Sequence, residues 1–511
     1  MVMFIELQQA FSLVFLDPVI WMIVIGSAVY GIFLGSMPGL TATMGVALFV
    51  PMTYWMEPVP ALAAIVTMVA CAIFAGDIPT TLMRVPGTPA SAAYADDAYA
   101  LAKRGEASKA LGNALWFSVA GGILGALLLM LVGHQLARVA SWFSVAEYFW
   151  LYLMGLSCAV VVGRSGVVRS GIGLSIGLLL STVGLSAVYG KARFTFGHPE
   201  LFQGFSFIPA MIGLFGLSEV LRGVMQSEKG EVVPFTDGEG SPLLLDPIKR
   251  FWERHRHWWR SSLIGSVIGA IPGAGADMAA WVCVAFSKRF SRTPDDYGRG
   301  SCDAIADACA GNSSSLAAAW VPALVFGIPG DSVTAIVIGV LYMKNLQPGP
   351  AIFEQQGELV YSLYLLFLMA NLVMLPLGYL AIRASSHVLR VPKSILLPIV
   401  TLFCVVGAYS INGSRFDVVL MVGFGVLGLI CERFRIAIGA LVLGLILGGP
   451  LEERFVQTLS GSNGSLWGFV DRPVALCLAI VCAIIWGRVL WKGMTAKTAN
   501  SPNETSDAAS S

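Results

Sequence analysis

Long apolar stretches separated by short polar segments recur along the whole chain, from the N-terminus to Trp491. Each is about 17 to 25 residues long, which is the length an α-helix needs to cross a bilayer. None alternates with the two-residue period of a barrel strand. The pattern predicts an all-α polytopic membrane protein with roughly twelve transmembrane helices. Four of these crossings are expected at 110–133, 140–163, 166–189 and 203–221.

The composition agrees with a protein that lies in the lipid bilayer. Of 511 residues, 56% are hydrophobic and 12% are charged, which is too apolar for a water-soluble globule. Residues 1–16 contain no Lys or Arg, so we expect this start to belong to the mature protein rather than to a cleaved signal peptide. The net charge of +1 gives no sign of a nucleic-acid partner, and none is expected.

Basic residues fall in clusters between the apolar stretches, and the positive-inside rule assigns these clusters to the cytoplasm. The longest polar interruption lies near the middle of the chain. We therefore predict four parts: a first membrane repeat at 1–222, a cytoplasmic linker at 223–260, a second membrane repeat at 261–491, and a disordered cytoplasmic tail at 492–511.

Two pairs of Pro-Gly motifs support this division. GSMPG at 35–39 matches GAIPG at 269–273, and RVPGTPASA at 84–92 matches GIPGDSVTA at 327–335. The two pairs occur in the same order and at nearly equal separations, which indicates an internal duplication. The charge map predicts that the two repeats have opposite orientations in the membrane. We expect two inverted repeats with broken helices or re-entrant hairpins.

Each Pro-Gly motif should interrupt a membrane helix, because proline removes a backbone donor and glycine leaves the backbone unshielded. The freed N–H and C=O groups must then be satisfied by protein, water or a ligand. A proline kink without a ligand is the alternative at any single motif. Hydroxyl and amide side chains cluster at the breaks and suit carboxylate oxygens or an alkali cation, although small residues also serve close helix packing. The substrate-binding candidates of this kind around the two pairs of motifs are Ser36, Thr41, Thr43, Thr88 and Asn312.

Charged residues near the breaks add three hypotheses. Arg84 is the first cation in the chain and could bind a substrate carboxylate through two hydrogen bonds. Its alternative partners are Asp77 or the membrane interface. For cation coupling by Na⁺ or H⁺, the candidates are Asp277, Ser313, Asp331 and Thr334, with the Na⁺ ligands undecided. Asp96 and Asp97 lie near Lys103 and Arg104 and indicate surface ion pairs.

Longer motifs resemble a known family. PGTPASAAYADDAYALAKRGEASKALG, then IPGAGAD and SKR, then GIPGDSVTAIVIGVLYMKNLQPGP are similar to the large membrane subunit of the tripartite tricarboxylate transporters. The resemblance runs from about Gly31 to the last span and is strongest at 84–112, 265–300 and 311–350. The motif residues that carry over by position are Pro38, Gly39, Pro86, Gly87, Thr88, Pro272, Gly273, Asn312, Pro329 and Gly330.

This resemblance implies a secondary, elevator-type carrier that imports organic carboxylates across the bacterial inner membrane. It also implies two partners, a periplasmic solute-binding protein and a small membrane subunit of about four spans. Moving an anion into a negative-inside cell costs about 2.3 kcal/mol per charge per 100 mV, so co-transport of Na⁺ or H⁺ is expected. A passive anion channel is the alternative, because broken helices also form pores. A membrane enzyme is not expected, because no nucleophile and base or metal cluster lies in the apolar region.

Overall fold

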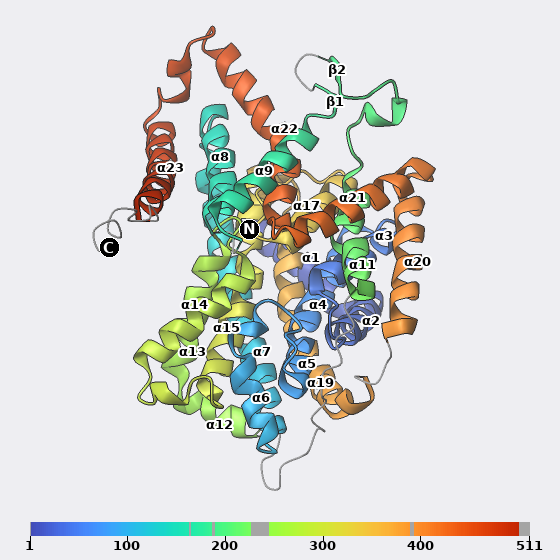
Figure 1. The fold of residues 1–511 in the computed structure, drawn as a ribbon, viewed down its shortest axis with the longest axis vertical. Helices are drawn as coiled ribbons and strands as arrows, with labels where there is room; N and C mark the ends of the chain where they lie inside the picture. The colour runs from blue at the N-terminus through green and yellow to red at the C-terminus, as the bar shows by residue number, and fades with distance from the viewer. Residues whose placement is uncertain (1, 163–164, 187–189, 226–244, 389–392, 500–511) are drawn as a thin grey trace, which may run out of the picture.

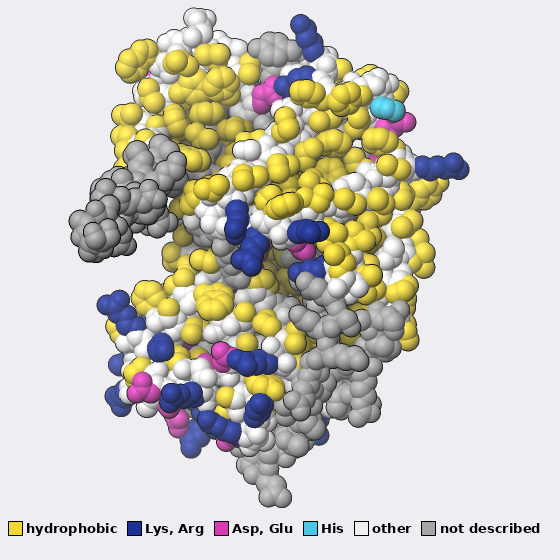
Figure 2. Space-filling view, viewed as in Figure 1, with side chains coloured by type: hydrophobic (Ala, Val, Ile, Leu, Met, Phe, Trp, Pro, Cys, Tyr) yellow, Lys and Arg dark blue, Asp and Glu magenta, His cyan; other side chains and the backbone are white. Residues whose placement is uncertain are grey.

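The computed structural model describes residues 2–162, 165–186, 190–225, 245–388 and 393–499. Most of these residues lie in helices, many of them arranged side by side (Figure 1). Apolar side chains cover much of the surface, whereas Lys and Arg gather at the end of the molecule formed by the helices α12, α13 and α14 (Figure 2). An apolar surface of this extent is typical of a protein surrounded by lipid.

The helical elements up to residue 225 are α1 (Val2–Leu16), α2 (Pro18–Gly35), α3 (Ala42–Thr53), α4 (Pro58–Ala75), α5 (Asp77–Met83), η1 (Ser91–Ala93), α6 (Ala95–Lys103), α7 (Ala107–Ala140), α8 (Val145–Val162), α9 (Val167–Ser181), η2 (Pro199–Leu201), α10 (Phe207–Met211), the π-helical η3 (Ile212–Leu217) and α11 (Ser218–Met225).

Those after residue 244 are α12 (Leu245–Glu253), α13 (His255–Gly269), α14 (Gly275–Phe290), η4 (Pro294–Asp296), α15 (Cys302–Ala318), α16 (Trp320–Phe326), α17 (Ser332–Met343), α18 (Pro350–Gln355), α19 (Gly357–Val388), α20 (Lys393–Asn412), α21 (Arg415–Arg433), α22 (Ile438–Gly461), η5 (Leu466–Phe469) and α23 (Pro473–Ala499).

Within the described residues, six helical stretches are long and apolar enough to cross a membrane. They are Pro18–Gly35, Pro58–Met83, Ala107–Ala140, Phe207–Met225, Gly357–Ser385 and Ile395–Asn412. Among the same described residues, six further apolar helices of 10–17 residues include Ala42–Thr53 and Ser332–Met343, which begin at Pro-Gly breaks. The protein is therefore a multi-pass membrane protein, and its total of roughly twelve spans stays a prediction. Helices occupy all four of the crossings that the sequence predicted between residues 110 and 221. The third ends early, since α9 stops at Ser181 rather than near residue 189.

Glycines set the closest helix contact of the first half. A Cβ atom placed on Gly31 would lie 2.3 Å from the carbonyl oxygen of Met68, and one on Gly35 would lie 2.2 Å from that of Ala72. Both distances are far inside van der Waals contact, so α2 and α4 approach to backbone distance only because these positions lack side chains.

The second half repeats this contact. A Cβ atom on Gly265 would lie 2.1 Å from the carbonyl oxygen of Gly311, and one on Gly269 would lie 2.3 Å from that of Ser315. The sequence alignment that pairs the Pro-Gly motifs also pairs these glycines and these carbonyls with those of α2 and α4. The agreement supports the predicted internal repeat, while its boundaries and inverted orientation stay predictions.

Helices of each half of the chain pack against helices of the other half. Helix α7 of the first half packs along α15, and α19 of the second half packs along α4. In the same way α22 packs against α9, and α21 packs against η3 (Figure 1). Each half therefore completes the apolar contacts of the other, and one large hydrophobic core contains residues from both.

Two local features differ from the predictions: a short β-hairpin is present, and the last helix is longer than expected. Gly184–Leu185 (β1) pairs antiparallel with Ala192–Arg193 (β2), in a segment expected to be partly helical. A bidentate ion pair of Arg193 with Glu452, at 2.8 and 2.9 Å, attaches this hairpin to α22. Helix α23 continues to Ala499, into the segment expected to be a tail. Residues 226–244 of the expected linker and 500–511 of the tail lie outside the described residues.

The α2–α4 contact makes a direct prediction about stability. Gly31→Ala should lower the free energy of unfolding by about 1–3 kcal/mol, because the new methyl group collides with backbone that cannot rotate away. Gly26→Ala on the same helix should have little effect, since nothing lies within 4 Å of its Cβ position. Thermal unfolding of the two variants in detergent measures the difference. Equal melting temperatures would contradict the close contact.

Candidate functional site

All four Pro-Gly motifs lie where helices end and the chain turns. They follow α2, α5, α13 and α16 and precede α3, η1, α14 and α17. Gly39 and Gly273 hold corresponding left-handed conformations, with φ of 89° and 78°. The predicted helix breaks are therefore present, and glycine is needed at these two because the backbone there is unfavourable for other residues.

Matching hydrogen bonds close the tips after α5 and α16. In the first half Thr88 N donates to Ser91 Oγ at 3.2 Å, and Ser91 N donates to Thr88 Oγ1 at 3.1 Å. In the second half Asp331 N donates to Thr334 Oγ1 at 2.9 Å, and Thr334 N donates to Asp331 Oδ1 at 2.8 Å. Both reciprocal pairs satisfy backbone groups at the break, and the second is a capping box at the N-terminus of α17. Thr334 and Asp331 thus cap the N-terminus of α17.

Close backbone contacts fix the same two tips. A Cβ atom on Gly87 would lie 2.5 Å from Cα of Gly76, and one on Gly330 would lie 2.9 Å from Cβ of Ala319. Gly273 N also donates to the carbonyl oxygen of Gly330 at 2.9 Å. The two breaks of the second half are therefore joined through their backbones.

A cavity of about 390 Å³ lies among these breaks. Seven of the predicted site residues line it: Thr41, Thr43, Thr88, Gly273, Asp277, Asn312 and Asp331. The side chain of Asn312 is 5% exposed, and its Oδ1 atom has no hydrogen-bond partner among the described residues. An unsatisfied buried amide oxygen is costly unless a ligand or water binds it, so this atom is a candidate contact for a ligand.

The other predicted residues do not line this cavity. Among them, Pro38, Gly39, Pro86, Gly87, Pro272, Pro329 and Gly330 form the breaks themselves. Ser313 and Thr334 are buried, and Ser36 donates its hydroxyl to the carbonyl oxygen of Ile32 at 2.7 Å.

Arg84 is also away from the cavity lining. It forms an ion pair with Asp96 at 2.6 Å, and the two side chains are 61% and 59% exposed. Its φ of 56° is left-handed and ends α5, as that of Gly327 ends α16. The structure gives it a helix-ending position and a solvent-exposed partner, so we do not include it in the proposed substrate site.

Asp77 and Asp97 have partners that the sequence did not indicate. Asp77 is 3% exposed and accepts hydrogen bonds from Tyr94 Oη and, at 3.7 Å, from Cys309 Sγ. Asp97 Oδ1 accepts from the backbone N–H groups of Gly298, Gly300 and Ser301 at 2.7, 3.0 and 2.8 Å. It therefore anchors α6 to the start of α15, where the sequence predicted a surface ion pair.

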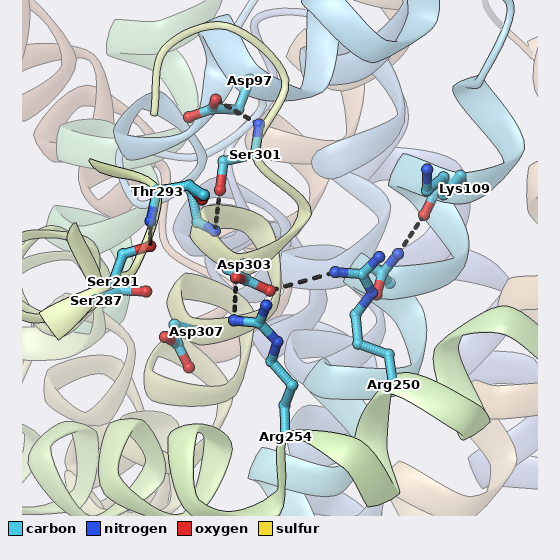
Figure 3. A network of polar contacts seen from close by, with 12 residues as sticks. Asp97, Lys109, Arg250, Arg254, Ser287, Ser291, Thr293, Ser301, Asp303 and Asp307 are labelled. Carbon is cyan, nitrogen blue, oxygen red and sulfur yellow. Dashed lines mark hydrogen bonds and ion pairs between the residues drawn. The ribbon is translucent and has the colours of Figure 1, made fainter. Parts of the chain in front are cut away.

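A polar network extends from this anchor (Figure 3). Asp303, near the start of α15, forms ion pairs with Arg250 at 3.2 Å and with Arg254, which come from α12 and the turn after it. The network joins α6, α12 and α15 at the basic end of the molecule. Its residues lie outside the cavity lining, and its ion pairs link the helices to one another.

Sequence reasoning missed a charged group in the cavity lining. Ser218, Glu219 and Arg222 come from α11, and Glu432 comes from α21. Arg222 forms ion pairs with Glu219 and, at 3.8 Å, with Glu432. The available signal was Glu219 itself, an acid inside the apolar stretch 203–221, since charged residues in such stretches usually face a functional interior.

Comparison with known proteins decides the family. The profile of the tripartite tricarboxylate transporter TctA family matches residues 20–443, which is most of the chain and contains every break. This protein belongs to the TctA family. The earlier resemblance is thereby confirmed, and a family of transporters, not of enzymes, accounts for the chain.

Two relatives of this TctA-family protein come from Agrobacterium vitis. An uncharacterized 52.8 kDa protein in the TAR-I ttuC' 3' region is 30% identical over 471 residues, which cover 91% of this chain and 92% of the relative. An uncharacterized protein in the TAR-II ttuC' 3' region is 30% identical over 224 residues, which cover 43% of this chain and 93% of the relative. No solved structure matches the chain.

The capping box of α17 in this TctA-family protein can be tested at Asp331. Asp331→Ala should lower the free energy of unfolding by about 1 kcal/mol, because the N–H of Thr334 loses its acceptor. Asp331→Asn should keep the stability of the wild type, since asparagine caps helices as well as aspartate. Thermal unfolding of the purified protein compares them. If Asn and Ala destabilise equally, the carboxylate does more than cap the helix.

Proposed function

We propose that this protein is the large permease subunit of a tripartite carrier that imports organic carboxylates together with Na⁺ or H⁺. The supporting observation is that three helices, α3, α14 and α17, begin at the breaks with their first residues in the cavity lining. Helix N-termini carry partial positive charge and free N–H groups, so three of them at one cavity suit an anion.

The chemistry of the lining suits a carboxylate in particular. Hydroxyls of Thr43 and Thr88 supply donors without a permanent charge. The cavity of about 390 Å³ is in the range that holds small organic molecules.

Cation coupling follows from the charges around the cavity. Its lining holds four acidic residues, Glu219, Asp277, Asp331 and Glu432, and one basic residue, Arg222, among the described residues. An anion entering such a surface is repelled unless cations accompany it. Asp277 at the N-terminal turn of α14 and the unsatisfied Oδ1 of Asn312 are the oxygens we assign to a co-transported cation.

The transport mechanism we propose is an elevator with inverted repeats. The two breaks of the second half are joined by the Gly273–Gly330 hydrogen bond, which supports their movement as one unit. We place the protein in the bacterial inner membrane, with a periplasmic solute-binding protein delivering the substrate and a small membrane subunit beside it. A passive anion channel is the competing proposal.

Uptake by membrane vesicles separates the carrier from the channel. Vesicles containing the complete assembly are given radiolabelled succinate, malate, citrate or an aromatic acid, with and without a Na⁺ or pH gradient. Accumulation above equilibrium that requires the gradient and the binding protein is expected. Equilibration alone under every gradient would show a channel.

Asp277 provides a test of cation coupling in the same vesicles. Asp277→Asn should reduce gradient-driven accumulation about tenfold or more, because a neutral amide binds a cation or proton much more weakly than a carboxylate. Exchange of internal for external substrate should be affected less, since it needs no net cation movement. Asp295→Asn, at an exposed acid outside the lining, is the control. Unchanged accumulation in Asp277→Asn would exclude this residue from coupling.

A further inference from the structure

Arg222 is the one lysine or arginine among the described residues that line the cavity. It extends from α11, whereas the broken helices that supply the neutral donors belong to other segments. Its side chain is 36% exposed, so it is accessible from the cavity and not enclosed by protein. In Figure 2, Lys and Arg side chains with an acidic side chain among them surround the hollowed middle of the visible face.

The two acids beside Arg222 hold it differently. Glu219 is three residues earlier on the same helix, is 7% exposed and is in direct contact with the guanidinium. Glu432 comes from α21 and is 3.8 Å away, which is beyond hydrogen-bonding distance. The Oε2 atom of Glu432 is buried and has no hydrogen-bond partner in the described part of the chain. Arg222 is therefore anchored by Glu219 and only loosely paired with Glu432.

We propose that Arg222 is the residue that binds the carboxylate of the transported anion, and that this carboxylate takes the place of Glu432 beside the guanidinium. The inference rests on the proposed carboxylate transport and identifies the residue that selects for it. A guanidinium presents five donors, so a carboxylate can bind through two hydrogen bonds while Glu219 keeps the side chain in position.

Exchange of one carboxylate for another explains how an anion enters an acidic cavity. While Glu432 is beside Arg222, the two charges partly cancel. A substrate that replaces Glu432 keeps the guanidinium paired but leaves a second carboxylate without its partner. A buried carboxylate without a partner is costly, so the exchange favours uptake of a cation or proton with the substrate.

The competing explanation is that the ion pairs only hold α11 to α21. The two explanations differ in the sign of one effect. If Glu432 competes with substrate, Glu432→Gln removes the competitor and strengthens substrate binding. If the pair is only a structural link, then removing either partner weakens the protein in the same direction.

The test measures the concentration dependence of uptake of succinate, malate and citrate by vesicles that contain the complete assembly. Arg222→Gln should raise KM about tenfold or more, and Arg222→Lys should recover part of that loss, since it keeps the charge but loses the two-bond geometry. Glu432→Gln should lower KM about twofold or more. Arg433→Gln, which removes an exposed charge from the same end of α21 outside the lining, should change KM less than about twofold.

Thermal unfolding of each purified variant, with and without the same acids, separates binding from folding. The expected result is that succinate, malate or citrate stabilises the wild type and Glu432→Gln but not Arg222→Gln. If the wild type accumulates a substrate while Arg222→Gln and Glu432→Gln shift KM in the same direction or not at all, this inference is wrong and the proposed function stands. If no acid is accumulated by or stabilises the wild type, the proposed function fails, and this inference fails with it.

Discussion

Broken helices in an apolar protein leave backbone N–H and C=O groups that water cannot reach, and the arrangement around the cavity follows from satisfying them. The Thr88–Ser91 and Asp331–Thr334 pairs satisfy part of this need locally. The cavity beside these breaks is also lined by Asn312, whose amide oxygen has no hydrogen-bond partner among the described residues. The same interruption that weakens a membrane helix thus creates a place whose chemistry suits a polar ligand.

Close backbone packing makes these breaks tolerable. Glycines at Gly31, Gly35, Gly265 and Gly269 bring helices together at distances that no other residue permits. These contacts fix α2 and α13, the helices that lead into the breaks at 38–39 and 272–273. Transport requires such order, because a site that binds a small anion must keep its donors within a fraction of an ångström.

The sequence predicted features that depend on neighbouring residues, and it did not predict contacts between helices that are distant along the chain. Prolines and glycines marked all four breaks, since their effect on the backbone acts within a few residues. Thr41, Thr43 and Asp277, which line the cavity, were named as candidates because they lie beside those motifs. Arg222 and Glu432 were not named as lining residues because α11 and α21 meet only in the folded protein. The ion pair of Arg84 with the exposed Asp96, away from the cavity lining, also depends on the fold.

The packing of helices from one half of the chain against helices from the other half has a consequence for biosynthesis. The faces of α4 and α9 that α19 and α22 later cover are already present when only the first half has emerged from the ribosome. Until the second half follows, those faces can be covered only by lipid, by the membrane insertion machinery or by a neighbouring chain. Assembly of this protein is therefore completed late, and a chain interrupted after its central linker would be recognised as unfinished by quality-control proteases rather than persist as half a transporter.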